Sequence, residues 1–414
     1  MRGRPTALQF ALRLWRKTSL TLLKQNRMTS ELSNFAARLR ERILLEGRVT
    51  RGPDLEAPNQ DWDSGSSPFR DDDVFNSLAL DLFTGQFAHN AAYRKISEAR
   101  GGTPITVTHW SQIPAVPTTA FKELELTCLA PRQRTHVFHS SGTTEQRSSR
   151  HFHNAESLAI YEASLLTWFR ACIPSTANLL ILTPTSAQAP HSSLVHMFET
   201  VRRDVGAVEI SFVGHTQGDG SWRLDFGAAS QALNCACRDN KPLTVLGTAF
   251  SFVHLVDFLA EHDLSFQLPP GSCVMETGGY KGRSRSLPKA KLHSLIKTRL
   301  GIPVSHIIPE YGTSELSSQA YDGGARDSED CSHPTPDSQH FHFPPWARVQ
   351  IISPETGREV AEGETGLIRV FDLANVFSVM AIQTEDLGIR RGVGFELIGR
   401  AELAEPRGCS LMAV

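Results

Sequence analysis

Short apolar runs alternate with segments of helical periodicity through the middle of the chain, and this alternation restricts the fold more than any other feature. Four apolar runs predict strands: Asn178–Thr183, Leu243–Gly247, Ser272–Met275 and His306–Ile308. Between them, Phe250–Glu261 is amphipathic, and Lys289–Leu300 is a predicted helix that ends at Gly301. Because strand–helix–strand units pair their strands in parallel, we expect an α/β fold with a mainly parallel sheet and surrounding helices.

The regions on either side of this alternation have other patterns. Arg348–Ile352 and Gly366–Asp372 have the composition of strands around a turn at residues 354–357, which predicts a β-rich C-terminal part. On the N-terminal side, Val74–Glu98 has helical spacing. We see no internal repeat.

The N-terminal region is set apart by its charge. Residues 1–27 carry basic side chains and no acid, residues 31–47 have helical spacing, and the stretch after them is rich in Gly, Pro, Ser and Asp. An acid-poor basic leader is typical of a mitochondrial transit peptide, whereas a leader before an alternative start at Met28 and a basic first helix are the other interpretations. We expect residues 1–70 to form a basic leader and linker, helical in part, followed by one domain over residues 71–414.

Composition excludes several classes of protein. Lys and Arg number 42 and Asp and Glu number 44, so the net charge of −2 gives no overall electrostatic footprint for nucleic acid. No apolar run reaches the roughly 18 residues of a membrane span. The seven cysteines are scattered and odd in number, which argues against a disulfide framework and for a reducing compartment. We therefore expect a cytoplasmic protein, with an organelle-targeting leader as the alternative.

The strongest local signal is the hydroxyl-rich segment Ser140–Thr144, which Arg147 and Arg150 follow. Hydroxyls around a glycine allow a tight turn whose backbone N–H and side-chain O–H groups converge, and such a turn binds anions, phosphates above all. The segment lacks the G-x-x-x-x-G-K-[ST] pattern of a Walker A loop. An ordinary Ser/Thr-rich turn is the structural alternative.

Further candidate residues lie in the C-terminal half. Tyr311–Glu315 comes just after a predicted strand, and a carboxylate at that end of a strand lies where ligands bind in α/β sheets, so Glu315 is a candidate Mg²⁺ ligand. Asp386 is a candidate for binding both hydroxyls of a ribose, with an ordinary turn as the alternative. Arg400 follows a glycine, and Cys409 is the sixth residue from the end.

The motifs occur in the order phosphate loop, Y-G-x-x-E, T-x-D and G-R. In this order they resemble the motifs of the adenylate-forming superfamily of acyl and aryl ligases. Within it, the chain resembles the LuxE-type acyl-protein synthetases, the acid-activating subunits of the bacterial bioluminescence fatty-acid reductase and their relatives. The segments that carry this resemblance are Phe121–Lys122, His139–Thr144, Ser192–Leu194, Gly278–Arg283, Tyr311–Glu315 with Ser318–Tyr321, Pro344–Trp346, Asp372–Asn375, Thr384–Gly388 and Arg407–Leu411. The resemblance runs from about residue 76 to the end and does not cover residues 1–70.

The resemblance implies the adenylating N-terminal domain of such ligases, with ATP and Mg²⁺ as cofactors. It also implies that a carboxylic acid, a fatty acid in this family, attacks the α-phosphate to give acyl-AMP and pyrophosphate, and that a thiol then takes the acyl group. In the light-emitting system this thiol belongs to the synthetase itself, near its C-terminus, and a reductase partner consumes the thioester. Cys409 occupies such a place.

Roles for individual residues follow from the same resemblance. Five residues match the phosphate loop: Ser140, Ser141, Gly142, Thr143 and Thr144. Gly278 and Gly279 fall where the superfamily lays backbone against adenine, and the Tyr311, Gly312 and Thr313 motif belongs to the nucleotide site. Glu315 matches the Mg²⁺ carboxylate, Asp386 matches the ribose carboxylate, and Arg400 matches the arginine that closes the nucleotide-binding domain.

The phosphate loop departs from the family pattern. Glu145 and Gln146 stand where the superfamily has glycine followed soon by lysine. Arg147 or Arg150 is the candidate for the missing positive charge.

The C-terminus departs as well. Only 14 residues follow Arg400, so we expect the mobile C-terminal domain, with its adenylation lysine, to be absent. Lys122, Lys281 and Arg283 are the candidates to replace that charge, and we select Lys281 as a catalytic residue.

Two alternatives for the function stay open at this point. In the first alternative, the acyl acceptor is CoA, an acyl carrier protein or an amine instead of Cys409. In the second, the chain is an inactive nucleotide-binding partner of a reductase, and Glu145 is a sign of lost activity. His139, His151 and His153 lie near the phosphate loop, where they contact phosphate, act as a base, or are simply packed.

Overall fold

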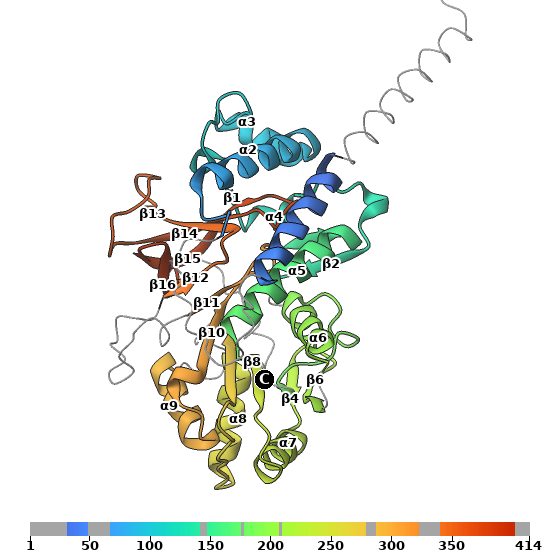
Figure 1. The fold of residues 1–414 in the computed structure, drawn as a ribbon, viewed down its shortest axis with the longest axis vertical. Coiled ribbons are helices and arrows are strands. Elements are labelled where there is room, and N and C mark those ends of the chain that lie inside the picture. Colours follow the sequence, from blue (N-terminus) through green and yellow to red (C-terminus); the bar gives the residue numbers. More distant parts are fainter. Residues whose placement is uncertain are drawn as a thin grey trace, which may run out of the picture.

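A computed structural model describes residues 31–48, 67–140, 147–174, 178–206, 209–278, 287–322 and 340–401. One sheet of twelve strands organises it, in the order β13-β14-β15-β16-β12-β11-β10-β9-β8-β4-β5, with β1 added beside β15 (Figure 1). The parallel half with helices α6 to α9 occupies the bottom of this view, and the antiparallel strands with α2 and α3 lie above it.

The parallel half confirms the predicted α/β alternation. Its five strands are β4 (Asn178–Ile181), β5 (Glu209–Phe212), β8 (Thr244–Thr248), β9 (Cys273–Thr277) and β10 (Ile307–Tyr311). Each neighbouring pair among them is parallel. The helices between them are α6 (Ser193–Val205), α7 (Phe226–Arg238), α8 (Ala249–Glu261) and α9 (Lys289–Leu300).

Helices cover both faces of this half because successive strand side chains point to opposite faces. Leu180, Val245 and Val274 share one hydrophobic cluster with residues of α7, α8 and α9. Leu179 and Met275 belong to a second cluster, which contains α6 and α5 (Ala155–Cys172). The strands are therefore continuous apolar runs, which explains why they stand out in the sequence.

The predicted β-rich C-terminal part is present, and it extends the same sheet. Its strands are β11 (Ala320–Asp322), β12 (Phe341–His342), β13 (Ala347–Ile352), β14 (Thr365–Asp372), β15 (Ala381–Arg391) and β16 (Gly394–Arg400), which pair antiparallel with their neighbours. The short strand β1 (Val116–Pro117) pairs parallel with β15. The change from parallel to antiparallel pairing falls between β10 and β11, so the loop that joins these two strands lies at the junction of the halves.

Helices on the N-terminal side share the main core with the antiparallel strands. Residues 31–48 are helical, and Leu39 and Ile43 of this helix belong to the main core. The segment predicted as one helix divides at Asn90 into α2 (Asp72–His89) and α3 (Ala91–Ala99), because the Asn90 side chain accepts a hydrogen bond from the backbone N–H of Tyr93 and so begins a second helix.

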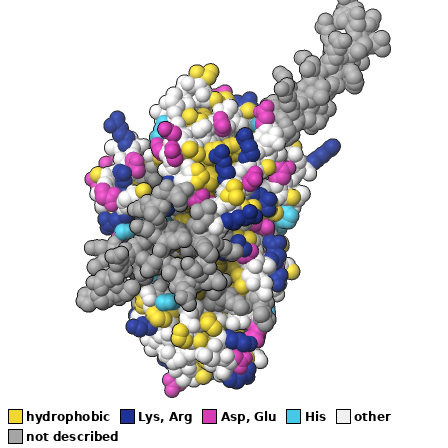
Figure 2. All heavy atoms as spheres, viewed as in Figure 1, with side chains coloured by type: hydrophobic (Ala, Val, Ile, Leu, Met, Phe, Trp, Pro, Cys, Tyr) yellow, Lys and Arg dark blue, Asp and Glu magenta, His cyan; other side chains and the backbone are white. Residues whose placement is uncertain are grey.

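The remaining elements are short. They are α4 (Ala120–Glu123), the hairpin of β2 (His136–His139) and β3 (Arg150–His153), the hairpin of β6 (Gly214–Thr216) and β7 (Trp222–Leu224), and single turns of 3₁₀-helix at Trp110–Gln112, Pro131–Gln133 and Val304–His306. Among the described helices, none combines the length and apolarity that crossing a membrane would need. Figure 2 shows acidic and basic side chains interspersed over the part of this face that is described, in keeping with the near-zero net charge.

Candidate active site

The candidate site is built around the loop that follows β10. In an α/β sheet, ligands bind beyond the carboxyl ends of the parallel strands, and this loop leaves that edge before the chain returns as β11. Residues 314–319 are all buried, and Glu315 is only 2% exposed. The predicted metal ligand is thus a buried carboxylate at the ligand-binding edge of the sheet.

A second buried carboxylate, Asp372 at the end of β14, holds this loop. Its oxygens accept hydrogen bonds from the backbone N–H of Ser317 at 2.9 Å and of Ser318 at 2.8 Å, and from the Ser318 hydroxyl at 2.8 Å. The backbone N–H of Ala374 adds a fourth bond at 3.0 Å. Burial raises the pKa of Asp372 to about 6, although these hydrogen bonds favour the ionised form.

The turn after β14 completes the support. The Asn375 side-chain NH2 donates to the backbone carbonyl of Glu315 at 2.9 Å, and the Ser317 hydroxyl donates to Asn375 Oδ1 at 3.1 Å. From α2, the buried Gln86 side chain donates to the backbone carbonyls of Asn375 and Val376. We call Asp372, Asn375 and Gln86 the loop brace, because together they fix the backbone that carries Glu315.

The first turn of the same loop contacts the strand that follows the predicted phosphate loop. The Ser314 and Ser149 hydroxyls lie 3.4 Å apart, and the Ser314 hydroxyl donates to Glu315 Oε2 at 3.2 Å. His151 Nδ1 lies 2.9 Å from the Ser314 carbonyl, and since a carbonyl only accepts, this nitrogen carries the proton. Burial lowers the pKa of His151 to about 4, so its ring is neutral at physiological pH.

The neighbouring histidines differ in environment. His153 is buried, its Nδ1 lies 3.1 Å from the Ser157 hydroxyl, and burial holds its pKa well below the usual value. His139 stacks on His191 with ring centroids 4.9 Å apart. His151 and His153 are therefore buried, neutral side chains that pack in the core and form hydrogen bonds with neighbouring residues. This agrees with the interpretation that they are packed residues without a charged role.

Tyr311, Asp386 and Arg400 come together from β10, β15 and β16. The Tyr311 hydroxyl donates to Asp386 Oδ2 at 2.9 Å, and Arg400 Nε donates to Asp386 Oδ1 at 3.2 Å. Asp386 and Arg400 are directly opposite in the antiparallel ladder, which explains their proximity. Burial and the Asp386 charge hold the pKa of Tyr311 well above its usual value, so its hydroxyl stays a donor.

Of the predicted phosphate loop, the structure describes Ser140, whose hydroxyl accepts a hydrogen bond from the backbone N–H of Ser149 at 2.9 Å. This bond joins the two ends of the segment that connects β2 and β3. The predicted site residues that lie outside the described part of the chain are Ser141, Gly142, Thr143, Thr144, Gly279, Lys281 and Cys409.

The two arginines expected to supply charge near the phosphate loop both face glutamates. Arg147 Nη1 lies 3.3 Å from Glu123 Oε2, and Arg150 Nη1 lies 4.0 Å from Glu125 Oε1. Both pairs are partly exposed to solvent, where such ion pairs contribute little to stability. Both arginines therefore lie close to the ends of the predicted phosphate loop. Sequence reasoning did not predict their ion pairs with Glu123, at the end of α4, and with Glu125.

The local structure bears on the residue type at three predicted nucleotide-site positions, Gly278, Gly312 and Thr313. Gly278 directly follows β9 with a φ of +93°, a conformation that side chains rarely adopt. A Cβ on Gly312 would lie 2.6 Å from Glu310 Oε1, so a larger residue at this position would require the Glu310 carboxylate to move. The Thr313 hydroxyl is buried and has no hydrogen-bond partner among the described residues.

Sequence reasoning assigned no role to several residues that build the site. Asp372 and Asn375 entered only as part of a motif, Gln86 did not enter at all, and Glu310 was overlooked. The Thr277 hydroxyl donates to Glu310, and burial together with the nearby Glu276 charge raises the pKa of Glu310 to about 7. Polar residues at the ends of predicted strands could have pointed to some of these residues, because Asp372 is the last residue of the predicted strand Gly366–Asp372.

Comparison with solved structures identifies the fold. The chain superposes on 2-hydroxyisobutyryl-CoA ligase with a TM-score of 0.59 and 15% identity, over 85% of this chain and 72% of that one. The architecture is thus that of adenylate-forming ligases, as the sequence motifs implied. The family model for "Acyl-protein synthetase, LuxE" matches residues 65–413, and the chain belongs to this family.

Two curated relatives are similar over part of their length. A long-chain-fatty-acid–luciferin-component ligase of Aliivibrio fischeri is 23% identical over 200 residues, which is 46% of this chain and 50% of the relative. A protein of the same name from Vibrio harveyi is 22% identical over 198 residues, 45% of this chain and 49% of the relative. The chain spans about half the length of the curated relatives it matches.

The raised pKa of Asp372 gives a test of the loop brace. Because the native state binds this proton more tightly than the unfolded chain, native stability from this group is greatest below pH 4 and falls as the pH rises to about 6. Between pH 4 and pH 6, the unfolding free energy of the wild type should fall by roughly 3 kcal/mol relative to that of Asp372→Asn. Above pH 7, the difference in unfolding free energy between the two proteins should be constant.

Urea unfolding at a series of pH values measures this difference. Asp81→Asn, the same change at an exposed position of α2, serves as the control and should follow the wild-type pH dependence. Parallel curves for the wild type and Asp372→Asn between pH 4 and pH 6 would contradict the raised pKa of Asp372.

Proposed function

We propose that this protein activates a carboxylic acid with ATP and transfers the acyl group to a thiol. The acid oxygen bonds to the α-phosphorus while the bond to pyrophosphate breaks, which gives acyl-AMP. A thiolate then bonds to the acyl carbon and AMP leaves. The observation that carries the proposal is the Tyr311–Asp386–Arg400 cluster at the same sheet edge as the buried Glu315 loop, in a member of the acyl-protein synthetase family.

The chemistry explains why such a site needs both parts. A carboxylate is a poor electrophile because its leaving group would be oxide, whereas an acyl adenylate has AMP as its leaving group. Asp386 suits the ribose end of ATP, since a carboxylate has about four acceptor positions and the two hydrogen bonds from Tyr311 and Arg400 leave others for hydroxyl groups. Tyr311 and Arg400 hold the carboxylate in one orientation.

The donor set around Glu315 fits Mg²⁺, which prefers oxygen ligands and keeps several waters. Glu315 would hold the ion, with the buried Thr313 hydroxyl as a further oxygen beside it. No group of three or more metal-ligating side chains occurs in the described part of the chain, and an ion held mainly by one carboxylate, substrate phosphates and water needs none. When bound, Mg²⁺ would offset the negative charge of the triphosphate.

For the substrate we propose a long-chain fatty acid, because both curated relatives are named as ligases of such acids. For the acceptor we propose Cys409, with CoA or an acyl carrier protein as the alternative, and we propose an acyl reductase as the partner that consumes the thioester. Lys281 is our candidate for the adenylation cation. We assign these steps to one adenylating domain over residues 71–414, acting in the cytoplasm.

Pyrophosphate exchange into ATP with a panel of carboxylic acids tests the proposal and separates an enzyme from an inactive nucleotide-binding partner. Asp386→Ala should raise the KM for ATP by roughly 10- to 100-fold, because losing a charged hydrogen-bond partner costs about 1.5–3 kcal/mol. The KM for the acid should change much less. Glu355→Ala, which removes a carboxylate from an exposed turn, is the control.

Two outcomes would contradict this assignment. The first is that the wild type shows no acid-dependent pyrophosphate exchange with any acid of the panel. The second is that Asp386→Ala keeps the wild-type KM for ATP.

Glu315→Gln tests the metal site with little change in side-chain volume. We expect the exchange rate at fixed Mg²⁺ to fall by on the order of 100-fold, or about 2.7 kcal/mol, as for the loss of one preorganised electrostatic contact. A Mg²⁺ titration should also require higher concentrations in the variant. A variant that exchanges pyrophosphate at the normal rate and Mg²⁺ dependence would show that another group holds the ion.

Cys409→Ser tests the acceptor. The variant should keep full pyrophosphate exchange, because adenylation needs no thiol, and should lose the hydroxylamine-sensitive acyl adduct that intact-protein mass spectrometry detects on the wild type. If the wild type carries no adduct during turnover with an acid that supports exchange, the acceptor is CoA or a carrier protein.

A further inference from the structure

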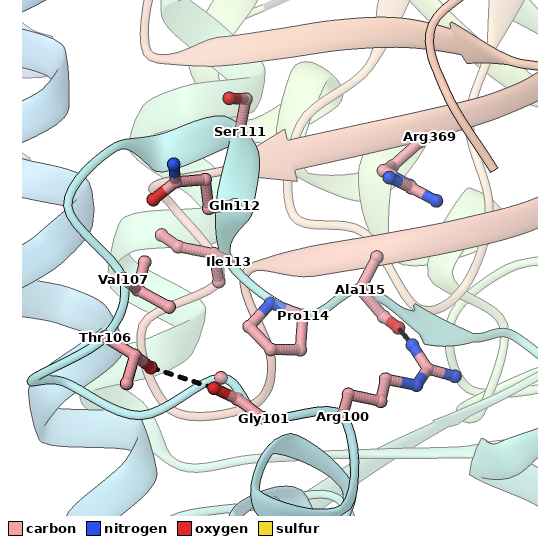
Figure 3. Close-up of a pocket in the computed structure, with 11 residues that line it drawn as sticks. Arg100, Gly101, Thr106, Val107, Ser111, Gln112, Ile113, Pro114, Ala115 and Arg369 are labelled. Carbon is pink, nitrogen blue, oxygen red and sulfur yellow. Dashed lines mark hydrogen bonds between the residues drawn. The ribbon is translucent and has the colours of Figure 1, made fainter.

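A cavity of about 340 Å³ lies away from the candidate active site, between the segment that follows α3 and strand β14 (Figure 3). None of the residues that line it belongs to the site described above. Gly101 and Gly102 shape one side, where a Cβ on Gly102 would lie 2.3 Å from Pro114 Cγ. Val107 and Ile113 add an apolar wall.

Two arginines supply the charge of this cavity. Arg100 comes from the end of α3 and Arg369 from the middle of β14, and both side chains border the same space beside Pro114 and Ala115. Arg100 Nη1 donates to the backbone carbonyl of Ala115, and Arg369 Nε donates to Gln383 Oε1 at 2.9 Å. A guanidinium carries five N–H donors, so these contacts occupy one donor of each group.

The arginines have no acidic partner in the part of the chain that the structure describes. Neither takes part in any ion pair with a described carboxylate. Burial and the positive charge of Arg100 both lower the pKa of Arg369, and no nearby acid opposes this effect. Arg100 is exposed and Arg369 is half-buried, so two like charges border the cavity, and a bound anion would offset both of them.

We propose that this cavity binds a phosphate-bearing small molecule, with Arg100 and Arg369 as its charged partners. Arginine forks match phosphate oxygens in pairs, and a phosphate dianion neutralises two guanidinium groups where a carboxylate neutralises one. The volume leaves room for an organic group attached to the phosphate. The proposal does not depend on the proposed ligase activity, because it uses a separate cavity and separate residues.

Protection of the two arginines from phenylglyoxal, followed by peptide mass spectrometry on the full-length wild type, tests this site without a substitution. Inorganic phosphate is the probe, with sodium chloride at the same ionic strength as the reference. At about ten times its Kd, phosphate should slow modification of Arg100 and Arg369 by on the order of tenfold, as mass action requires. Exposed Arg223 and Arg358 are internal controls and should react at the same rate in both solutions.

A matched pair of variants provides the second arm. Arg369→Gln should abolish phosphate protection of Arg100, whereas Arg223→Gln should retain it. Equal rates for Arg100 and Arg369 in phosphate and chloride would overturn the site, and equal protection by acetate would overturn the preference for phosphate. Phosphate bound at the nucleotide site does not protect these two arginines, so this result is independent of pyrophosphate exchange.

Discussion

The hydrogen bonds that Asp372 accepts are the interaction on which the candidate active site depends. Its carboxylate connects the end of β14 to the backbone of the loop after β10, and so fixes the segment that presents Glu315. Buried polar groups of this kind stabilise one arrangement only when every member is satisfied, and here three backbone N–H groups and one hydroxyl converge on the same carboxylate. A loop with a buried acid at its centre is thereby held without regular secondary structure.

The brace also explains why the two halves of the sheet act as one support. Parallel strands place the loop at the ligand-binding edge, and the antiparallel strands carry Asp386 and Arg400 toward the same edge. Gln86 extends the brace to α2: the backbone N–H of Met380 donates to its side-chain oxygen at 3.0 Å, while its amide serves two carbonyls. The N-terminal helices therefore contribute to the position of site residues that lie far from them in sequence.

Charge is distributed unevenly between the two regions that we assign to phosphate-bearing ligands. Near the phosphate loop, Arg147 and Arg150 have glutamate partners, so their charge is already offset. In the cavity beside β14, Arg100 and Arg369 have carbonyl partners instead. A carbonyl satisfies an N–H without cancelling the positive charge of the guanidinium, so the charge of Arg100 and Arg369 is left for the anion that we propose for this cavity.

The sequence by itself determined the parallel half of the fold, because its strands are buried on both faces and its helices are periodic, and both signals are local. It also singled out Glu315, Asp386 and Arg400 as candidate site residues, because each stands in a recognisable motif. Only the tertiary structure decided what holds them. Ser318 and Asp372 are 54 residues apart, and Gln86 and Met380 are 294 apart. Partners at such separations meet only when the whole sheet is assembled, so no local pattern encodes them.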